Sequence, residues 1–349
     1  MTTKILLSGP GLIGRQHVRL VQERHDCELV GIVAPDTDEN SIFAKSVLTP
    51  LFSDFVNALT STSPDGVIIS SPNHFHYEQA ALCLNAGVPA LVEKPITDSL
   101  EDAARLTELV EQTSIPLLIG HHRTYSPLVD IVLEFLRSER FGRLVAINGS
   151  ALFLKPDHYF EDGPWRKVKG GGPILINLIH EIGLMRTFAG EIHAVQAVAS
   201  SSLRGFEVED TVAINLEFSN GALGTFILSD AAASSKSWEM TAGENPSYPF
   251  FPQDSCYHMA GTMGSIDFPS MSFRTYPNED GRSWWKPFEL GQLTVHRADP
   301  LVRQLDHFLD VIRNGTPPKV SAFDGYKNMR VLVAVNEAIA SGARTYVSE

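Results

Sequence analysis

The chain has only three cysteines among its 349 residues, Cys27, Cys83 and Cys256, and they stand far apart in the sequence. This number and spacing exclude a disulfide framework and a cysteine zinc knuckle, and an odd count is typical of a reducing compartment. The chain also lacks any run of about 18 apolar residues, the length that a membrane-spanning helix needs. Its first residues show no pattern of a cleaved secretory signal. We therefore expect a cytoplasmic protein with no membrane partner.

Basic residues are also in deficit, because 28 lysines and arginines stand against 41 acidic residues and the formal net charge is −13. An acidic surface repels phosphate backbones, so we expect no nucleic-acid partner. Hydrophobic residues at 43% and charged residues at 20% are typical of a folded protein. With about 150 residues per domain as the usual scale, this length predicts two domains.

Strand-like and helix-like segments alternate through the first third of the chain. We predict strands and helices in turn at 4–7, 13–24, 27–33, 54–59, 66–70, 77–86, 89–92, 100–113 and 116–119. This order predicts a doubly wound parallel sheet covered by helices, with all strand ends on one side. We therefore assign residues 1–122 to an α/β domain of the Rossmann type, and the next motifs indicate that it binds a dinucleotide, NAD(P).

Beyond Pro127 the alternation of strands and helices stops. One helix is predicted at 128–138, and strands separated by turns follow it. The strands are predicted at 143–153, 195–200, 211–218, 222–229, 265–268 and 293–296. Residues 123–349 thus form a predicted α+β domain for substrate binding and oligomerisation, with a large, mainly antiparallel, open-faced sheet. A last helix, over about 326–341, is expected to pack back on the first domain. The stretch 234–259 is expected to form an irregular loop at a pocket or a subunit interface.

A glycine motif, Gly9-x-Gly11-x-x-Gly14, lies between the first predicted strand and the first helix. The first glycine permits a tight turn, the second lets the backbone approach a pyrophosphate, and the third lets helix and strand pack closely. Leu12 and Ile13 begin the helix, whose N-terminal N–H groups and dipole favour an anion. In this context the motif predicts a bound dinucleotide.

The acidic residue expected about 20 positions after the glycines, which would bind the adenosine ribose, is missing, since Ala34 stands there. Asp36 and Asp38 follow closely, and either they take its place or they simply solvate a turn; we take Asp36 as the candidate. Their charge repels a 2′-phosphate, and the sequence places no arginine beside them. NAD is therefore the expected cofactor, with NADP as the alternative.

A loop with Ser71, Pro72, Asn73 and His76 follows the strand predicted at 66–70, where loop atoms reach the nicotinamide end of a dinucleotide. Asn73 has the groups to hydrogen-bond ribose or amide, and His76 either does so or caps the next helix. The spacing of His74 and His76 also resembles that of two metal ligands. No Asp, Glu or Cys stands at a ligand-like spacing around them, so we predict no metal site.

Glu93-Lys94-Pro95 ends the strand predicted at 89–92, so Lys94 is expected at the carboxyl edge of the same sheet. Beside a positively charged nicotinamide and partly desolvated, an ammonium there is suited to hold a substrate hydroxyl and ease its deprotonation. The alternative is a surface lysine paired with Glu93.

Gly170-Gly171-Gly172 leads into a predicted helix with Pro173 in its first turn. Asn177 and His180 are three residues apart on it and share one face of an otherwise apolar run. Two polar residues on an apolar stripe need partners, although a lone buried histidine is more often structural than catalytic.

Together these pieces resemble the glucose-fructose oxidoreductase, inositol dehydrogenase and MocA (Gfo/Idh/MocA) family of nicotinamide-dependent oxidoreductases. The resemblance covers nearly the whole chain, and Glu93-Lys94-Pro95 after the strand at 89–92 is its specific motif. It implies that Lys94 binds the reacting hydroxyl, that His180 is the acid/base, and that Glu93 and Lys94 belong to the cofactor site.

The chain departs from the family pattern four residues before the histidine, where the family has aspartate and this sequence has Ile176. Asn177 stands one residue later. We expect Asn177 to orient substrate or His180, and the family's proton relay through aspartate to be absent.

Other candidate substrate contacts are Arg123 and Tyr125 after the strand predicted at 116–119, and Trp165 and Arg166 before the glycine run. The arginines are suited to grip a carboxylate or several hydroxyls, and Trp165 offers a stacking face for a ring. The alternative is that both arginines tie the two domains together.

The sequence thus predicts an NAD(P)-dependent dehydrogenase that oxidises a secondary alcohol of a sugar, polyol, cyclitol or related cyclic diol by hydride transfer. A carboxylated cyclohexadiene diol is a further substrate of this kind. Two alternatives are a redox-neutral, glycosidase-like enzyme that uses NAD transiently, and a non-catalytic regulator that senses dinucleotide. We expect a small-molecule substrate and a homodimer or homotetramer that covers the exposed sheet face.

Overall fold

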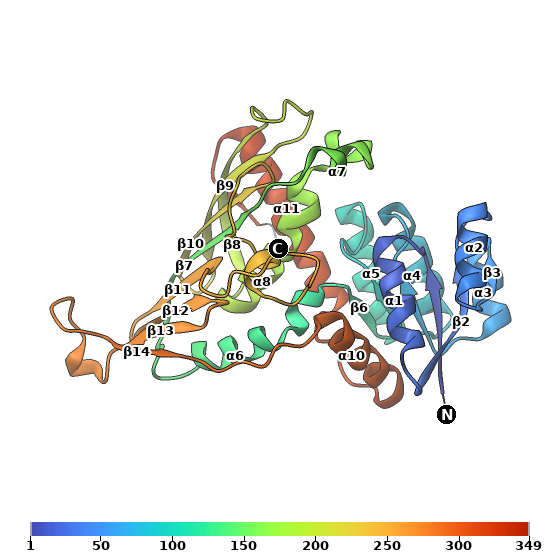
Figure 1. Cartoon of the computed structure of the whole chain (residues 1–349), viewed down its shortest axis with the longest axis horizontal. Helices are drawn as coiled ribbons and strands as arrows, with labels where there is room; N and C mark the ends of the chain where they lie inside the picture. Colours follow the sequence, from blue (N-terminus) through green and yellow to red (C-terminus); the bar gives the residue numbers. More distant parts are fainter. Residues whose placement is uncertain (1, 348–349) are drawn as a thin grey trace. The chain divides into compact units, whose positions relative to one another are not determined.

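The computed structural model describes residues 2–347, which divide into two compact units. The first unit comprises Met1–His122 and Leu301–Met329, and the second comprises Arg123–Pro300 and Arg330–Glu349. Figure 1 labels the helices and strands of each unit.

A six-stranded, fully parallel sheet forms the centre of the first unit, in the order β3-β2-β1-β4-β5-β6. The strands are β1 (Thr3–Ser8), β2 (Cys27–Val33), β3 (Leu51–Phe52), β4 (Gly66–Ile69), β5 (Ala90–Val92) and β6 (Leu117–Ile119). Apolar side chains such as Ile5, Ile68 and Leu91 are completely buried, because helices cover both faces of the sheet. The strand order reverses between β1 and β4, which is where such sheets bind ligands.

Five helices and one short turn connect these strands. They are α1 (Leu12–Gln22), α2 (Asp38–Ser46), α3 (Phe55–Thr62), the 3₁₀ turn η1 (Asn73–Phe75), α4 (His76–Asn85) and α5 (Leu100–Thr113). The side chains of Thr37, Asp54 and Ser99 cap α2, α3 and α5 by accepting a backbone N–H of the first turn. These caps explain where the three helices begin.

A helix from far along the chain, α10 (Pro300–Asn314), completes the core of the first unit, and the sequence analysis did not predict it. Leu305, Phe308 and Leu309 join the buried cluster around β1 and α1. Gly66 makes room for this helix, since a Cβ there would lie 2.4 Å from Cδ1 of Ile312. The next helix, α11 (Ala322–Ser341), contributes residues to both units.

The second unit is built on a nine-stranded sheet in the order β14-β13-β12-β11-β7-β10-β9-β8-β15. The strands are β7 (Leu144–Leu152), β8 (Ile192–Ser200), β9 (Thr211–Phe218), β10 (Leu223–Ser229), β11 (Tyr257–Gly261), β12 (Gly264–Phe268), β13 (Ser272–Thr275), β14 (Glu289–Gln292) and β15 (Thr345–Tyr346). Every strand pair in it is antiparallel except β7 with β10. The predicted fold class, a Rossmann domain followed by an α+β domain with a mainly antiparallel sheet, is confirmed.

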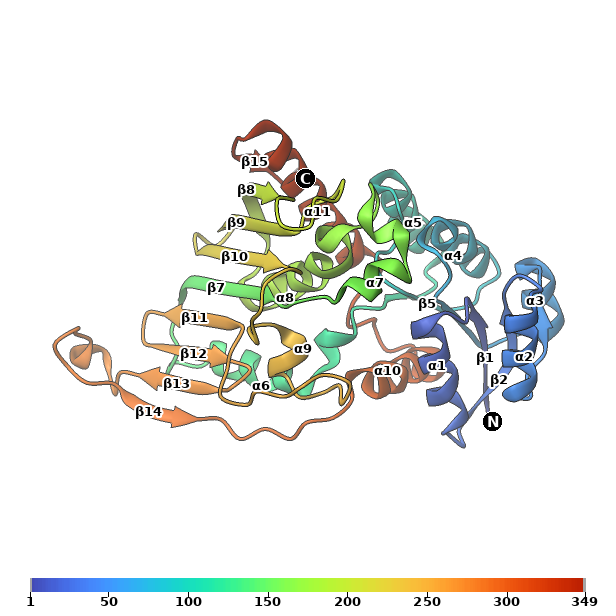
Figure 2. The same cartoon turned by 45° about the horizontal axis from the view of Figure 1, so that its top comes forward.

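Helices cover one face of this sheet, as Figure 2 shows for α6 and α8. The helical segments of the unit are η2 (His122–Tyr125), α6 (Pro127–Leu136), α7 (Asp157–Glu161), η3 (Pro164–Lys167), the π-helical turn η4 (Ile174–Leu178), α8 (Ile179–Ala189), α9 (Trp238–Thr241) and η5 (Glu279–Gly281). On the covered face Phe188 of α8 packs against Tyr257 and Phe268 at ring distances of 5.6 and 5.1 Å. Along β9, buried and more exposed residues alternate, as expected for a sheet with one open face.

Two predictions for this unit are corrected. Residues 293–296 are irregular. The strand lies just before them, at β14 (Glu289–Gln292), which pairs with β13 at one edge of the sheet. The stretch 234–259 is not wholly a loop, because it contains α9 and the start of β11.

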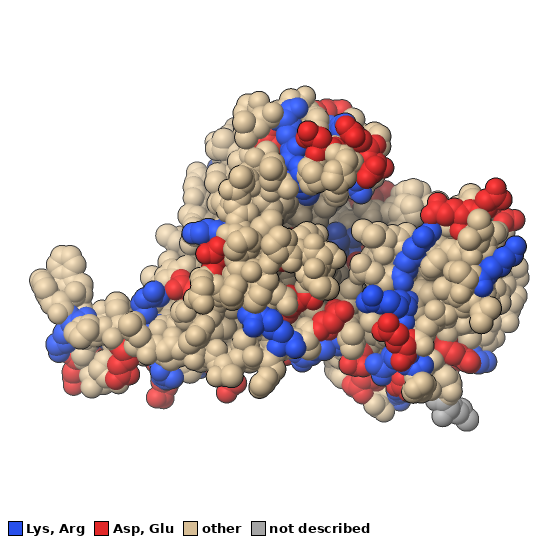
Figure 3. Space-filling view, in the orientation of Figure 1, with Lys and Arg blue, Asp and Glu red and all other residues tan. Residues whose placement is uncertain are grey.

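The charges on the face shown in Figure 3 are mixed, with basic side chains interspersed among acidic ones. Among residues 2–347, no helix combines the length and apolar character needed to cross a bilayer.

Candidate active site

The glycine turn lies between β1 and α1, and two of its glycines are required by close packing. Gly9 has φ of +84°, and a Cβ there would lie 2.4 Å from the backbone nitrogen of Ser71. A Cβ on Gly14 would lie 2.1 Å from the carbonyl oxygen of Gly9. Ser70 Oγ also donates to that oxygen at 2.8 Å, so the turn is fixed against the end of β4.

Gly11 has different surroundings, because apart from its chain neighbours no described residue has a heavy atom within 4 Å of a Cβ built there. Helix α1 begins directly after it with the exposed Leu12 and with Ile13, and no described side chain caps its first turn. Open space next to uncapped backbone N–H groups fits the pyrophosphate of a dinucleotide.

The loop after β2 carries the predicted ribose contact, Asp36, which is exposed and accepts a hydrogen bond from Ser41 Oγ at 3.0 Å. An arginine lies near this loop, contrary to our expectation. Arg15 of α1 donates to Glu39 Oε1 at 2.6 Å and to the carbonyl oxygen of Pro10 at 3.0 Å. Asp38 is not in a turn, since it begins α2, where its charge complements the helix dipole.

His76 holds two loops together. Its ring is fully buried, with Nδ1 2.8 Å from the carbonyl oxygen of Pro95 and Nε2 2.9 Å from that of Ser71. Burial lowers the pKa of this imidazole. Both ring nitrogens face backbone carbonyls, so the geometry favours a role in fixing the loops after β4 and β5. Pro72 and Asn73 follow Ser71 in the same loop at the surface.

Lys94 follows β5 and comes directly after a buried carboxylate, that of Glu93. Glu93 is 5% exposed, and its Oε1 lies 3.0 Å from Nε2 of His17 in α1. Burial by itself would raise the pKa of Glu93, but the hydrogen bond with His17 and the charges of His17, His122 and Lys94 together outweigh it and lower this pKa. Gly120 must be glycine, because a Cβ would lie 2.8 Å from the Glu93 carboxyl group. The Glu93–His17 contact thus joins the lysine-bearing strand end to the helix of the glycine turn.

In the second unit, the glycine run packs on the loop that contains Trp165 and Arg166. A Cβ on Gly171 would lie 2.5 Å from the carbonyl oxygen of Trp165, and Gly172 has φ of +80°. Arg166 donates to the carbonyl oxygen of Tyr159 and stacks on that ring at 3.9 Å, while half of the Trp165 surface is exposed. These contacts fix the start of the segment that leads to His180.

The segment predicted as an α-helix through Asn177 is a π-helical turn, and the α-helix itself begins only at Ile179. The directions of the Asn177 and His180 side chains are therefore not those of simple α-helical spacing. Such single π-turns are frequent at functional sites. His180 is buried, and Ile176 and Asn177 are half-buried.

Lys155, which the sequence analysis did not single out, contacts this turn. Its Nζ lies 2.8 Å from Oδ1 of Asn177 and 3.5 Å from Oδ2 of Asp230. Burial lowers the pKa of Lys155 to about 8, although the nearby Asp230 opposes the shift.

Arg123 is held by two carboxylates. Its guanidinium donates to Glu181 Oε1 at 2.5 Å and to Glu239 Oε1 at 2.6 Å, and it is 5% exposed. Tyr257 donates from its hydroxyl to the other oxygen of Glu181. Arg123 thus anchors α8 one residue after His180, and Tyr125 is buried in the same short turn. This arrangement favours a structural role for Arg123 over contact with substrate.

Sequence reasoning missed three residues around the candidates: His17, Lys155 and Glu181. Glu181 directly follows His180 and is a charged residue in an apolar helix, which is a signal that a buried partner exists. His17 lies 76 residues from Glu93 and Lys155 lies 22 residues from Asn177, so no local spacing connects them.

Two family models match the chain. Residues 3–121 match the NAD-binding Rossmann fold of an oxidoreductase family, and residues 130–267 match the GFO/IDH/MocA C-terminal domain. Among the described residues, no group of three or more His, Cys, Asp or Glu side chains is placed to hold a metal ion.

Curated relatives and solved structures agree with these models. The 4-carboxy-2-hydroxymuconate-6-semialdehyde dehydrogenase of Sphingobium sp. is 30% identical over 125 residues, covering 36% of this chain and 40% of that protein. Inositol 2-dehydrogenase 2 of Saccharopolyspora erythraea is 25% identical over 353 residues, covering 98% and 95%. A crystal structure of an Agrobacterium radiobacter oxidoreductase with NAD+, L-tartaric acid and magnesium has a TM-score of 0.83 at 17% identity, with 99% of each chain covered.

One matching model lies in each unit: the first spans the glycine turn, and the second spans the glycine run and the helix of His180. The structural likeness by itself shows the fold. The chain belongs to the Gfo/Idh/MocA family of oxidoreductases, and its first unit is that family's NAD-binding Rossmann domain.

Proposed function

We propose that this protein is an NAD(P)-dependent dehydrogenase that oxidises a secondary alcohol of a sugar, polyol, cyclitol or related cyclic diol. The observation that carries the proposal is the Glu93–His17 contact of 3.0 Å, which couples the strand end bearing Lys94 to the helix of the dinucleotide turn. A sensor of dinucleotide would not need an ammonium held at that place. The inositol dehydrogenase and semialdehyde dehydrogenase relatives support an alcohol or hydrated aldehyde as the reacting group.

In the proposed reaction, bound NAD supplies the hydride acceptor, C4 of its nicotinamide. Lys94 donates a hydrogen bond from Nζ to the substrate hydroxyl oxygen and stabilises the alkoxide that develops there. His180 accepts the hydroxyl proton on an imidazole nitrogen as the carbinol C–H bond breaks and the ketone forms. Asn177, Trp165 and Arg166 orient the substrate, whereas Arg123 is left out because two carboxylates hold it.

The cofactor contacts in this proposal all lie in the first unit. Gly9, Gly11, Leu12, Ile13 and Gly14 would hold the pyrophosphate, since their backbone forms the open turn at the start of α1. The loop of Ser71, Pro72 and Asn73 would meet the nicotinamide end and Asp36 the adenosine ribose.

The proposal is tested by following absorbance of reduced nicotinamide with NAD or NADP and a panel of sugars, inositols, sugar acids and cyclic diols. We expect a substrate-dependent rise that falls by at least about a thousandfold in Lys94→Ala and His180→Ala, because each removes a group that acts on the reacting oxygen. Lys45→Ala, on the surface of α2, is the matched control and should keep full activity. Full turnover in Lys94→Ala with unchanged NADH binding would refute the assigned roles.

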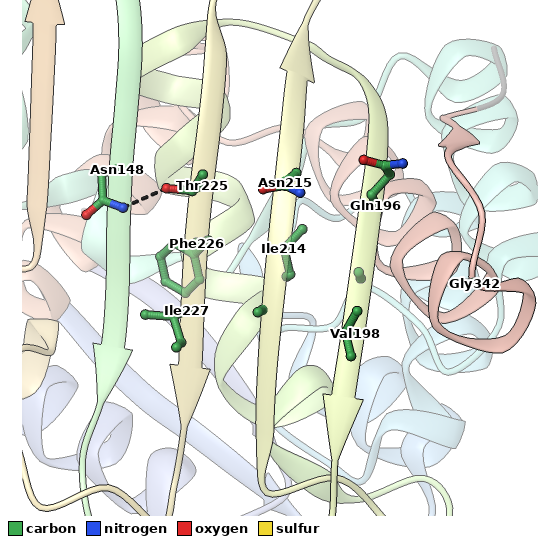
Figure 4. Close-up of a pocket in the computed structure, with 11 residues that line it drawn as sticks. Asn148, Gln196, Val198, Ile214, Asn215, Thr225, Phe226, Ile227 and Gly342 are labelled. Carbon is green, nitrogen blue, oxygen red and sulfur yellow. Dashed lines mark hydrogen bonds between the residues drawn. The ribbon is translucent and has the colours of Figure 1, made fainter.

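We also propose that the protein is a homodimer or homotetramer formed through the open face of the nine-stranded sheet. Figure 4 shows this face, where Asn148, Thr225, Asn215 and Gln196 stand in a row across β7, β10, β9 and β8. Asn148 donates to Thr225 at 2.6 Å. The same unit exposes Val198, Leu223 and Ile227 by 74%, 60% and 40%, an apolar surface that a second copy would cover.

A further inference from the structure

The strongest unassigned feature is the buried ammonium of Lys155, which follows β7. Its backbone is fixed at both ends, because its N–H donates to the carbonyl oxygen of Asp230 at 2.9 Å and its own carbonyl oxygen accepts from Arg204 at 2.8 Å. The side chain passes the rings of Phe153 and Tyr159, which lie 5.5 and 5.1 Å from Nζ. Lys155 is therefore held in one position with only 11% of its side chain exposed.

The lysine determines how Asn177 presents its amide group. An ammonium has donors only, so the amide atom 2.8 Å from Nζ must be the acceptor Oδ1. The amide nitrogen of Asn177 then points away from Lys155, and Nδ2 has no hydrogen-bond partner within residues 2–347. Two N–H groups on a half-buried residue of the π-turn are thus available to an acceptor.

The hydrogen-bond donors around Lys155 have few acceptors. Asp230 accepts from Nε of Arg204 at 2.8 Å and lies 3.5 Å from Lys155, Arg204 also lies 3.8 Å from Asp157, and the charges of Asp230 and Glu239 both act on Lys155. Arg166 stacks on the same Tyr159 ring as Lys155, and its Nε is buried without a partner among the described residues. Carboxylates therefore balance much of the charge, and the groups that lack a partner are two donors, Nδ2 of Asn177 and Nε of Arg166.

From this geometry we infer that Lys155, Nδ2 of Asn177 and Arg166 form a subsite for an oxyanion on the substrate, a carboxylate or a phosphate. Nδ2 of Asn177 and Nε of Arg166 are donors without an acceptor, and an anionic oxygen supplies acceptors beside the two cationic side chains. The inference rests on the proposed dehydrogenase and narrows its substrates to acids or phosphate esters. Lys155 is then the residue that determines specificity, while His180, three residues after Asn177, acts on the hydroxyl.

The test measures binding and turnover separately, using the full chain saturated with cofactor. Calorimetry with NADH-loaded protein compares L-tartrate with L-threitol, D-glucuronate with D-glucose, and D-glucose 6-phosphate with D-glucose. The same compounds are then assayed with NAD and NADP. We expect at least one anion to bind about tenfold or more tightly than its neutral partner, as a hydrogen-bonded charge pair gives. The tartrate and glucuronate arms identify a carboxylate, and the glucose 6-phosphate arm identifies a phosphate.

Two variants assign the preference to this subsite. Lys155→Met should abolish the preference for the anion over its neutral partner, and Lys155→Arg should restore part of it. Asn177→Asp keeps the contact with Lys155 but places a carboxylate against the ligand, so it should reverse the preference. Lys167→Met is the matched control, because Lys167 also stacks on an aromatic ring, that of Phe206, and should leave the preference unchanged. A thermal melt of each variant checks that it is folded.

The outcomes separate this inference from the proposed function. If the wild type turns over a neutral alcohol as efficiently as the matching acid and phosphate ester, the inferred subsite is wrong and the proposed dehydrogenase activity is supported. Binding of an anion that depends on Lys155, with no turnover of any compound, supports the subsite and contradicts the dehydrogenase. Absence of binding by every anion at millimolar concentration, or a preference unchanged in Lys155→Met, overturns the inference.

Discussion

Gly11 and Gly14 lie three residues apart at the start of α1, yet a methyl group added to each would meet opposite surroundings. At Gly11 it would enter open space, and the φ of −73° suits any residue. We expect Gly11→Ala to leave the free energy of unfolding nearly unchanged and to weaken NADH binding by about tenfold, because the methyl group occupies the approach of the pyrophosphate. Fluorescence titration with NADH and urea denaturation measure the two effects.

Gly14→Ala is the comparison variant, in which the added methyl group meets packed atoms. Its Cβ would lie 2.1 Å from the carbonyl oxygen of Gly9, so we expect a loss of about 1–3 kcal/mol in the free energy of unfolding. NADH affinity that is unaffected by Gly11→Ala would contradict the assignment of this turn to the pyrophosphate. A wild-type stability in Gly14→Ala would contradict the packing argument.

Individual residues differ in how well the sequence identifies them, and the reason is the range of the contact that positions each one. Gly9, Gly11 and Gly14 act through a local turn, so their spacing is sufficient to predict it. Lys155 acts through contacts with Asn177 and Asp230, which lie on separate elements, and nothing near it in the sequence indicates them. The two carboxylate partners of Arg123 lie 58 and 116 residues away, so the sequence did not reveal them and Arg123 was predicted to contact substrate.

Three elements meet at the Arg123 guanidinium: η2, which contains it, α8 through Glu181, and α9 through Glu239. Removing the arginine leaves two buried carboxylates without their counter-ion. We expect Arg123→Met to lower the free energy of unfolding by about 3–5 kcal/mol, as measured by urea denaturation. Because α8 carries His180, we also expect kcat to fall in whatever fraction of the variant folds.

The matched control is Arg274→Met on β13. Arg274 lies 2.8 Å from Asp267, but its side chain is 43% exposed, so its loss should cost less than about 1 kcal/mol. Equal effects of the two substitutions would mean that the buried network around Arg123 does not anchor α8.

Elements with strong local signals were predicted almost to the residue, and β2, α5 and β9 have the predicted bounds. Helix α10 was missed although its apolar residues recur at helical spacing, because its place in the first unit depends on a core formed by residues at the other end of the chain, such as Ile5 and Val18. The π-turn before α8 was also missed. Its apolar residues fit an α-helix equally well, and only the backbone hydrogen bonds distinguish the two.

At the scale of the whole molecule, the nine-stranded sheet leaves one face without a covering layer. Stable homodimers bury about 800 Å² or more per partner, and this face offers apolar side chains around the polar row of Figure 4. We expect light scattering after size-exclusion chromatography to give the mass of a dimer or tetramer at micromolar concentration. The proposed NAD-binding turn lies on a different unit and does not depend on this face.

Val198→Lys and Ile227→Lys place charges on this face and should convert the oligomer to monomers, because burying an unpaired ammonium costs several kcal/mol. Ile42→Lys is the matched control, since Ile42 is 67% exposed on α2 of the first unit. A wild type that is monomeric, or an oligomer that survives both sheet substitutions, would place the association surface elsewhere or remove it. An oligomer lost in Ile42→Lys would move the surface to the first unit, and the open sheet face would then need another partner.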